Sequence, residues 1–229
     1  MDYNQPIPAR EAPLIENITV EESGEPLVCL SDYSHDFLFE PVYYNKGIAG
    51  SINAFYVRQQ VAQRLLEASR LLPSGYKIKI FDAWRPYKVQ LSLYNSFYQD
   101  NLRAESTGQS TQEIDKMTRQ YVSFPSTDPG RPFLHATGGA VDLTMVKNGQ
   151  PVDMGTDFDA FTEKAHTGYF ELNKTKPDIT SNRRLLYNVL NEAGFVNYPF
   201  EWWHFDYGDW VWAFYNKCQA IYGGMASCD

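Results

Sequence analysis

The sequence predicts a single α+β domain with a central antiparallel sheet flanked by helices. Apolar residues recur at helical spacing in several segments, whereas other segments alternate apolar and polar residues as strands do. The dipeptide Asn148-Gly149 lies between two strand-like segments and is a strong type I′ hairpin signal, which joins antiparallel strands. No repeat, low-complexity tract or linker divides the 229 residues, so the chain 1–229 is interpreted as one domain.

The first half of the chain is predicted to hold an arm, a helix, a strand and a second helix. Prolines spread through residues 1–26 predict an irregular arm. An apolar stripe predicts a helix from near Asn53 that ends at Pro73-Ser74-Gly75. Alternation over residues 77–81 predicts a strand, and residues 82–86 predict a turn into the next helix, with Pro86 in its first turn.

The second half is predicted to carry most of the sheet. Residues 101–110 are polar and predict a loop, after which Ser110 and Glu113 match a capping box at the start of a helix. After a proline-rich loop, residues 140–146 predict a strand, and residues 150–154 should pair back on it. Further predictions are a helix capped by Thr180 or Ser181 and ended by Gly194, strands within 195–206, and a closing helix over 210–222.

Charge and composition exclude several classes of protein. The chain has 20 Lys and Arg against 28 Asp and Glu, a net charge of −8, which argues against binding to a nucleic-acid backbone. It shows neither an apolar run of membrane-spanning length nor a secretory leader, although a chain whose leader had been removed would look the same. Three cysteines without a close pair favour free thiols in a reducing cytoplasm.

Histidine is scarce, and two of the four histidines have chemically suggestive neighbours. His135 precedes Asp142 in one segment, and His204 follows Glu201 in another. Imidazole and carboxylate together suit a zinc ion, and three protein ligands plus a water are typical of catalytic zinc. On a straight strand His135 and Asp142 would face opposite sides, and Gly138-Gly139 offers a bend that would turn both inward.

The position of Glu201 suits a general base, which must lie near the metal without binding it. Glu201 and His204 would meet on a helical turn, so a bend is needed if they lie on a strand. Each residue also has a structural interpretation: His204 as a packed core residue, Asp142 as a local cap, and the glycines as a simple turn. His35 and His166 lack comparable neighbours and are interpreted as surface or loop residues.

Four segments together resemble the D-Ala-D-Ala dipeptidases of the VanX type, within a zinc D,D-peptidase family that also includes D,D-carboxypeptidases and phage endolysins. Residues 133–142 (FLHATGGAVD) are similar to the family motif S-x-H-x-x-G-x-A-x-D, and residues 201–204 (EWWH) to its E-x-[WH]-H motif. Residues 82–86 (DAWRP) look like the D-A-Y-R-P segment of the dipeptidases, and Met154-Gly155 with Phe158-Asp159 matches a later stretch. The resemblance runs from about residue 30 to about residue 206 and implies a hedgehog/D,D-peptidase-like fold.

The resemblance also implies roles for individual residues. His135, Asp142 and His204 would hold one Zn²⁺ per chain, and no other cofactor is expected. Glu201 would activate the metal-bound water, and Arg85 would stabilise the oxyanion, although a structural ion pair with Asp82 is the alternative for Arg85. The candidate substrate-binding residues are Asp82, which would orient Arg85, and the acids Asp159 and Glu163, either of which would receive the substrate amine. Phe133 stands where the family has a serine near the substrate, so the detailed contacts to the dipeptide are left open.

The expected function is zinc-dependent hydrolysis of D-Ala-D-Ala by a cytoplasmic enzyme, with this small dipeptide as substrate and neither nucleic acid nor membrane as partner. The alternative is a D,D-carboxypeptidase or endolysin-type peptidase that acts on longer stem peptides of peptidoglycan. A third hypothesis is a binding protein that keeps the zinc fold without catalysis. The sequence leaves the oligomeric state open.

Overall fold

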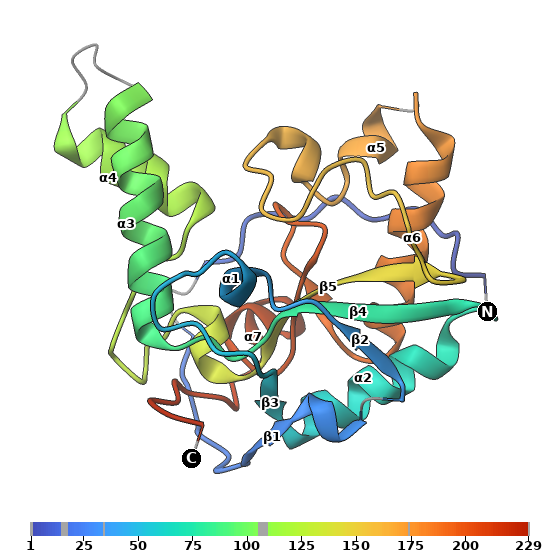
Figure 1. Ribbon diagram of the computed structural model, residues 1–229, viewed down its shortest axis with the longest axis horizontal. Helices are drawn as coiled ribbons and strands as arrows, with labels where there is room; N and C mark the ends of the chain where they lie inside the picture. Colours follow the sequence, from blue (N-terminus) through green and yellow to red (C-terminus); the bar gives the residue numbers. More distant parts are fainter. Residues whose placement is uncertain (1, 15–17, 34, 105–109, 174, 229) are drawn as a thin grey trace.

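The computed structural model describes residues 2–14, 18–33, 35–104, 110–173 and 175–228. Its larger sheet has the strand order β2-β4-β5-β8-β7, with β6 paired to β5 (Figure 1). These strands are β2 (Phe37–Phe39), β4 (Tyr76–Asp82), β5 (Ala140–Lys147), β6 (Gln150–Pro151), β7 (Val196–Asn197) and β8 (His204–Asp206). A second, two-stranded sheet pairs β1 (Leu27–Cys29) with β3 (Tyr56–Arg58).

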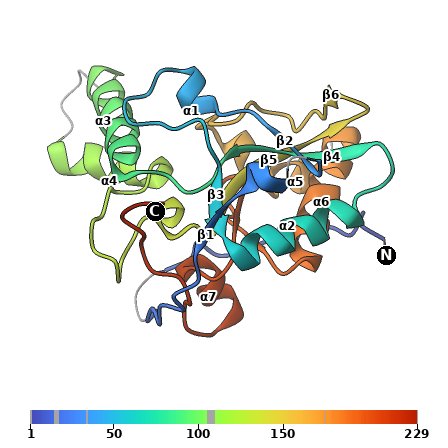
Figure 2. The same ribbon diagram turned by 60° about the horizontal axis from the view of Figure 1, so that its bottom comes forward.

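Seven helices surround the sheets within the described part of the chain. They are α1 (Val42–Asn45), α2 (Gln59–Leu71), α3 (Tyr87–Ala104), α4 (Thr111–Tyr121), α5 (Tyr169–Leu172), α6 (Pro177–Glu192) and α7 (Trp210–Asn216). Three short 3-10 turns are η1 (Leu30–Tyr33), η2 (Leu134–Thr137) and η3 (Glu163–Ala165). Helices α3 and α4 lie side by side and project from one side of the molecule in both ribbon views (Figures 1 and 2).

The α+β class is confirmed, but the larger sheet is not wholly antiparallel. Strand β2 runs parallel to β4 at one edge, with Phe37 opposite Ile78. The other pairings in this sheet are antiparallel. The chain between β2 and β4 contains α1, β3 and α2, and a connection of this length allows two strands to run in the same direction.

Four predicted element boundaries in the helices are wrong. Residues 56–58 form β3, so α2 begins at Gln59 rather than near Asn53. Helix α3 continues to Ala104, through the first part of the predicted loop 101–110, of which residues 105–109 lie outside the described residues. Helix α6 begins at Pro177 instead of at Thr180 or Ser181, because Pro suits a first helical position. Helix α7 ends at Asn216, where Lys217 turns left-handed with a φ of 54°.

Local signals were more reliable than these boundaries. The capping box of Ser110 and Glu113 is present at the start of α4. Asn148 and Gly149 have φ of 51° and 79°, as a type I′ turn requires. The return strand is shorter than predicted, since β6 ends at Pro151. Pro86 lies one residue before α3, and its carbonyl accepts the first hydrogen bonds of that helix.

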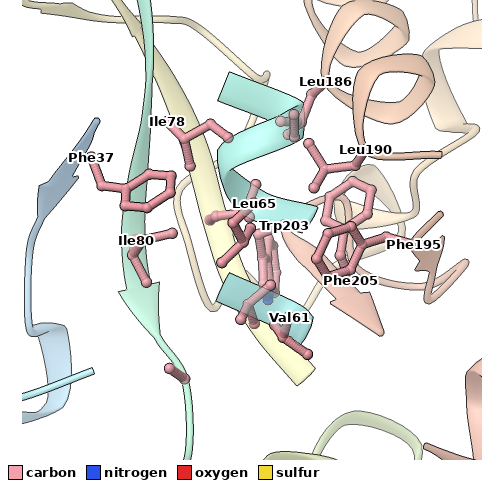
Figure 3. Close-up of a cluster of buried hydrophobic side chains, with 14 of the residues drawn as sticks. Phe37, Val61, Leu65, Ile78, Ile80, Leu186, Leu190, Phe195, Trp203 and Phe205 are labelled. Atoms are coloured by element: carbon pink, nitrogen blue, oxygen red, sulfur yellow. The ribbon is translucent and has the colours of Figure 1, made fainter. Parts of the chain in front are cut away.

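The hydrophobic core lies between one face of the larger sheet and helices α2 and α6 (Figure 3). Ile78 and Ile80 from β4 and Phe205 from β8 contribute to it, as do Leu65 from α2 and Leu190 from α6. Side chains alternate along a strand, so the neighbours of core residues on β5 and β8 project from the opposite face. That opposite face carries Asp82, Asp142 and His204.

The arm before β1 packs on the body of the domain. Within its described residues it forms a single β-bridge, Val20 to Ala220, and no helix or strand. Glu22 accepts two hydrogen bonds from the fully buried Arg58, both at 2.9 Å. Among the helices described, none combines the length and apolarity that crossing a bilayer requires.

Candidate metal centre

Strand register places three acidic or imidazole side chains in a row across the larger sheet. Asp142 on β5 lies opposite His204 on β8 and, on its other side, opposite Asp82 on β4. The register of β4 shifts between Ile80 and Asp82, as at a β-bulge, and this shift brings Asp82 onto the face of Asp142. Residues 62 and 60 positions apart in the chain therefore meet because three strands pair in register.

His135 reaches the same place from a turn rather than from a strand. It belongs to the 3-10 turn η2, which ends at Gly138 in the left-handed conformation with a φ of 70°. The left-handed conformation favours glycine at this position, and a Cβ there would also press on the tip of the Leu27 side chain. The predicted bend at Gly138-Gly139 exists, and it turns the chain from η2 into β5.

His135, Asp142 and His204 offer three ligand atoms within 4.8 Å of one another, and all three side chains are buried. Asp142 Oδ2 lies 3.3 Å from His135 Nε2, and Asp142 Oδ1 lies 2.9 Å from His204 Nδ1. Burial by itself would raise the pKa of Asp142, but the two imidazoles outweigh it and hold that pKa below its usual range. Two imidazoles and one carboxylate are a donor set that suits Zn²⁺ with a position left for water.

The remaining ring nitrogens of both histidines have partners that orient them. His135 Nδ1 lies 2.7 Å from the carbonyl oxygen of Ala83, and His204 Nε2 lies 2.8 Å from Asp206 Oδ1. Such partners select the tautomer that points the other nitrogen at a metal. The candidate ligand atoms therefore suit a metal ion, and so do the partners that orient the two histidine rings.

Asp206 and Asp209 are polar residues that the sequence reasoning missed. Both are fully buried, and Asp209 Oδ1 caps α7 by accepting hydrogen bonds from the N–H groups of Val211 and Trp212. Burial and the neighbouring Asp206 carboxylate raise the pKa of Asp209 well above its usual range. The two-residue spacing of His204 and Asp206 on a strand was the available signal, since such residues share a face.

Arg85 lies beside the three ligands and is held from several sides. Its Nε donates to Asp82 Oδ2 at 2.8 Å and its Nη1 to Gln90 Oε1 at 2.6 Å, while its Nη2 lies 3.6 Å from Asp142 Oδ2. The guanidinium also stacks over the Tyr43 ring, 4.9 Å from its centroid. Arg85 therefore forms the ion pair with Asp82 that was its alternative role, and it also lies beside the candidate metal ligands.

Glu201 lies on the turn that precedes β8, where the His204 N–H bonds to the Glu201 carbonyl oxygen at 3.3 Å. This is the bend that the spacing of the two residues required. Glu201 Oε2 is 3.8 Å from His204 Nδ1, close to the ligand cluster but not part of it. Burial raises the pKa of Glu201 to about 8.

One cavity of about 300 Å³ is lined by His135, Asp142, His204, Glu201 and Arg85. Asp159 lines it too, with its Oδ1 accepting a hydrogen bond from the Tyr43 hydroxyl at 3.1 Å and its Oδ2 3.9 Å from Lys46 Nζ. Burial raises the pKa of Asp159 to about 6. Phe133, at the position of the family serine, also lines the cavity.

One candidate residue and two histidines lie apart from this cluster. Glu163 is exposed at the start of η3, outside the cavity lining. His35 is exposed, and the His166 ring packs edge-on against Phe200 with centroids 5.1 Å apart. The prediction that these two histidines stand outside the metal cluster agrees with their positions.

Comparison with known proteins identifies a family that matches this chain. A family model described as "D-ala-D-ala dipeptidase" matches residues 47–220, a range that contains the three candidate ligands, Glu201 and Arg85. A Synechocystis protein named D-alanyl-D-alanine dipeptidase is 29% identical over 220 residues, covering 87% of this chain and 89% of the relative. A protein of the same name from Enterococcus faecium is 29% identical over 163 residues, covering 67% of this chain and 74% of the relative.

One solved structure also shows a likeness. It is a crystal structure of a vancomycin resistance D,D-pentapeptidase, VanY, in complex with Zn(II). The similarity covers 73% of this chain and 83% of that chain, with a TM-score of 0.43 and 15% identity.

Proposed function

The chain belongs to the D-ala-D-ala dipeptidase family of peptidases, and from that premise and the cavity geometry we propose that it hydrolyses D-Ala-D-Ala to two D-alanines. The observation that carries the proposal is the buried group of His135, Asp142 and His204 with Glu201 and Arg85 at its side. These residues supply a metal site, a base and an oxyanion partner in one cavity.

Zn²⁺ is the metal we propose for His135, Asp142 and His204. When bound there, it would polarise the scissile carbonyl and lower the pKa of a water molecule. The partly buried Glu201 would accept the proton of that water as the oxygen attacks the carbonyl carbon. It then delivers the proton to the amide nitrogen as the C–N bond breaks, so that one water is consumed and two amino acids leave.

A positive charge near Glu201 is required for this role. Its pKa of about 8 would leave it largely protonated at neutral pH, because burial disfavours the carboxylate. Nearby positive charge favours the ionised form, and Arg85 acts in this direction. A cation held by His135, Asp142 and His204 would act in the same direction.

Arg85 is the proposed oxyanion partner. A fixed cation placed where negative charge develops stabilises the tetrahedral transition state more than the substrate. Asp82 and Gln90 hold the guanidinium in position through bonds of 2.8 and 2.6 Å. We assign Asp82 as a positioning residue that acts through Arg85.

Asp159 is the acid we assign to the substrate's free amine. It lines the cavity and has the Tyr43 hydroxyl as a fixed neighbour. Glu163 lies outside the cavity lining, which favours Asp159 of the two candidates. We place the reaction in the cytoplasm, where free D-Ala-D-Ala is made.

The test is release of D-alanine from D-Ala-D-Ala by purified, zinc-loaded protein. Glu201→Gln should lower kcat by about 10²–10⁴-fold with zinc retained. Glu67→Gln, which changes an exposed acid on α2, is the matched control and should behave as wild type. Failure of the zinc-loaded wild type to hydrolyse the dipeptide would refute the assignment.

The same assay separates the alternatives. Faster hydrolysis of a muramyl pentapeptide than of D-Ala-D-Ala would indicate a D,D-carboxypeptidase or endolysin-type peptidase. Bound zinc without turnover of any D,D-peptide would indicate a binding protein.

A further inference from the structure

The cavity extends beyond the catalytic cluster to helices α3 and α4. Its wall there includes Phe97, Asp100, Arg119, Val122 and Ser123. A free dipeptide carries an ammonium at one end and a carboxylate at the other. The proposed site assigns Asp159 to the ammonium. At the position where the family has a serine near the substrate, the Phe133 side chain offers no hydrogen-bond donor, so the carboxylate needs a partner elsewhere.

Three cationic side chains line the cavity among the described residues: Lys46, Arg85 and Arg119. Arg85 is buried and committed to Asp82. Lys46 lies 3.9 Å from Asp159, at the end assigned to the ammonium, where the Asp159 carboxylate would repel a second carboxylate. Among these three cations, this leaves Arg119 on the α3–α4 wall as the partner of the substrate carboxylate, and its own acid, Asp115, lies outside the cavity lining.

Arg119 lies in the last turn of α4 and is held against the cavity wall. Its Nε donates to Asp115 Oδ2 at 2.6 Å, and its guanidinium stacks over the Phe124 ring at 4.2 Å from the centroid. A guanidinium has about five N–H donors in a planar fork, so one bond to Asp115 leaves donors that suit a carboxylate. About half of the side chain is exposed, which leaves it accessible from the cavity.

Two consecutive hydrogen bonds connect this wall to Arg85, the proposed oxyanion partner. Arg85 Nη1 donates to Gln90 Oε1 at 2.6 Å, and Gln90 Nε2 donates to the Ser123 carbonyl oxygen at 2.7 Å. Ser123 follows Arg119 by four residues. In a dipeptide the carboxylate lies one residue beyond the scissile bond, a step of about 3.8 Å between Cα atoms. The segment that carries Arg119 is thus anchored beside the place where the scissile bond would lie.

We propose that Arg119 binds the C-terminal carboxylate of the substrate, an inference that rests on the proposed dipeptidase function. The cavity would then recognise both charged ends of a free dipeptide, with Asp159 at the amine and Arg119 at the carboxylate. It would select free dipeptides over dipeptide amides.

The test compares D-Ala-D-Ala with D-Ala-D-Ala amide on wild type, Arg119→Met and Arg119→Lys. Arg119→Met should raise KM for the free acid about 10-fold or more with kcat nearly unchanged, because the contact exists before and during reaction. The KM of Arg119→Lys for the free acid should lie between the values for wild type and Arg119→Met. Wild type should show a similarly raised KM for the amide, and Arg119→Met should not raise it further.

Arg131→Met is the matched control, since it removes the same charge from an exposed site outside the cavity lining. Equal KM values for Arg119→Met and Arg131→Met would overturn the inference, as would equal KM values of wild type for acid and amide. If wild type binds D-Ala-D-Ala without turnover, the proposed function fails. Calorimetric binding of the dipeptide to zinc-loaded wild type and Arg119→Met then tests Arg119 alone, and unchanged affinity overturns its role.

Discussion

Asp206 offers a direct test of whether a neighbouring carboxylate strengthens the proposed metal ligand His204. The residue is fully buried on β8, and its Oδ1 lies 2.8 Å from His204 Nε2. Asparagine has almost the same shape but carries no charge. We predict that Asp206→Asn folds and binds Zn²⁺ about 10–100-fold more weakly, because outer-contact residues typically contribute this much to metal affinity.

The predicted loss of zinc affinity follows from weakening the hydrogen bond between His204 Nε2 and Asp206 Oδ1. A hydrogen bond to a charged group contributes about 1.5–3 kcal/mol. Since about 1.4 kcal/mol corresponds to a tenfold change in an equilibrium constant, losing most of this contribution gives about one to two powers of ten. Burial of Asp206 limits solvent screening, so the effect should fall within this range rather than below it.

Asp209 adds a second consequence of the same substitution. The pKa of Asp209 is raised well above its usual range by burial and by the Asp206 carboxylate. Asparagine at position 206 removes that negative charge, so the Asp209 pKa should fall towards the value that burial alone sets. The thermal midpoint should be recorded beside the metal affinity, so that loss of zinc binding is separated from loss of folding.

The assay is a competition titration of zinc between the protein and a chromophoric chelator. Asp36→Asn serves as the control, since Asp36 is exposed and lies outside the cavity lining. An Asp206→Asn variant that is folded and holds zinc within about twofold of wild type would refute the reasoning, because charge on Asp206 would then contribute nothing to ligand strength.

Three further predictions test other parts of the site. Gln90→Met should lower kcat about tenfold with KM little changed in steady-state assays, since Gln90 holds Arg85 for a charge that develops only in the transition state; a change confined to KM would contradict this. Burial raises the pKa of Asp159 to about 6, and only the carboxylate binds an ammonium, so KM for D-Ala-D-Ala should fall as pH rises towards 6. A pH titration of Asp159→Asn should lack this dependence, and its persistence would exclude Asp159. Arg58→Met should lower the free energy of unfolding in urea by about 2–4 kcal/mol, because the buried guanidinium joins Glu22 to the Thr137 carbonyl oxygen; a loss under about 1 kcal/mol would count against this.

Signals confined to a few neighbouring residues predicted structure well. The capping box at Ser110 and the turn at Asn148-Gly149 are both present, because the interactions that stabilise them lie within four residues. The helix start near Asn53 was wrong because residues 56–58 pair with β1, almost thirty residues earlier in the chain. Strand pairing at that separation depends on partners that no local pattern reveals.

The sequence by itself determined the chemistry of this protein: two imidazoles, a carboxylate, a base and an arginine in motifs that resemble one family. Those identities are local, since a side chain's donor atoms belong to its residue type. Only the tertiary structure decided that Asp82, Asp142 and His204 form one row, that Asp206 lies behind His204, and that Arg119 shares the cavity. These relations come from strand register and helix packing between distant segments, and register alone decides which face of a sheet each side chain occupies.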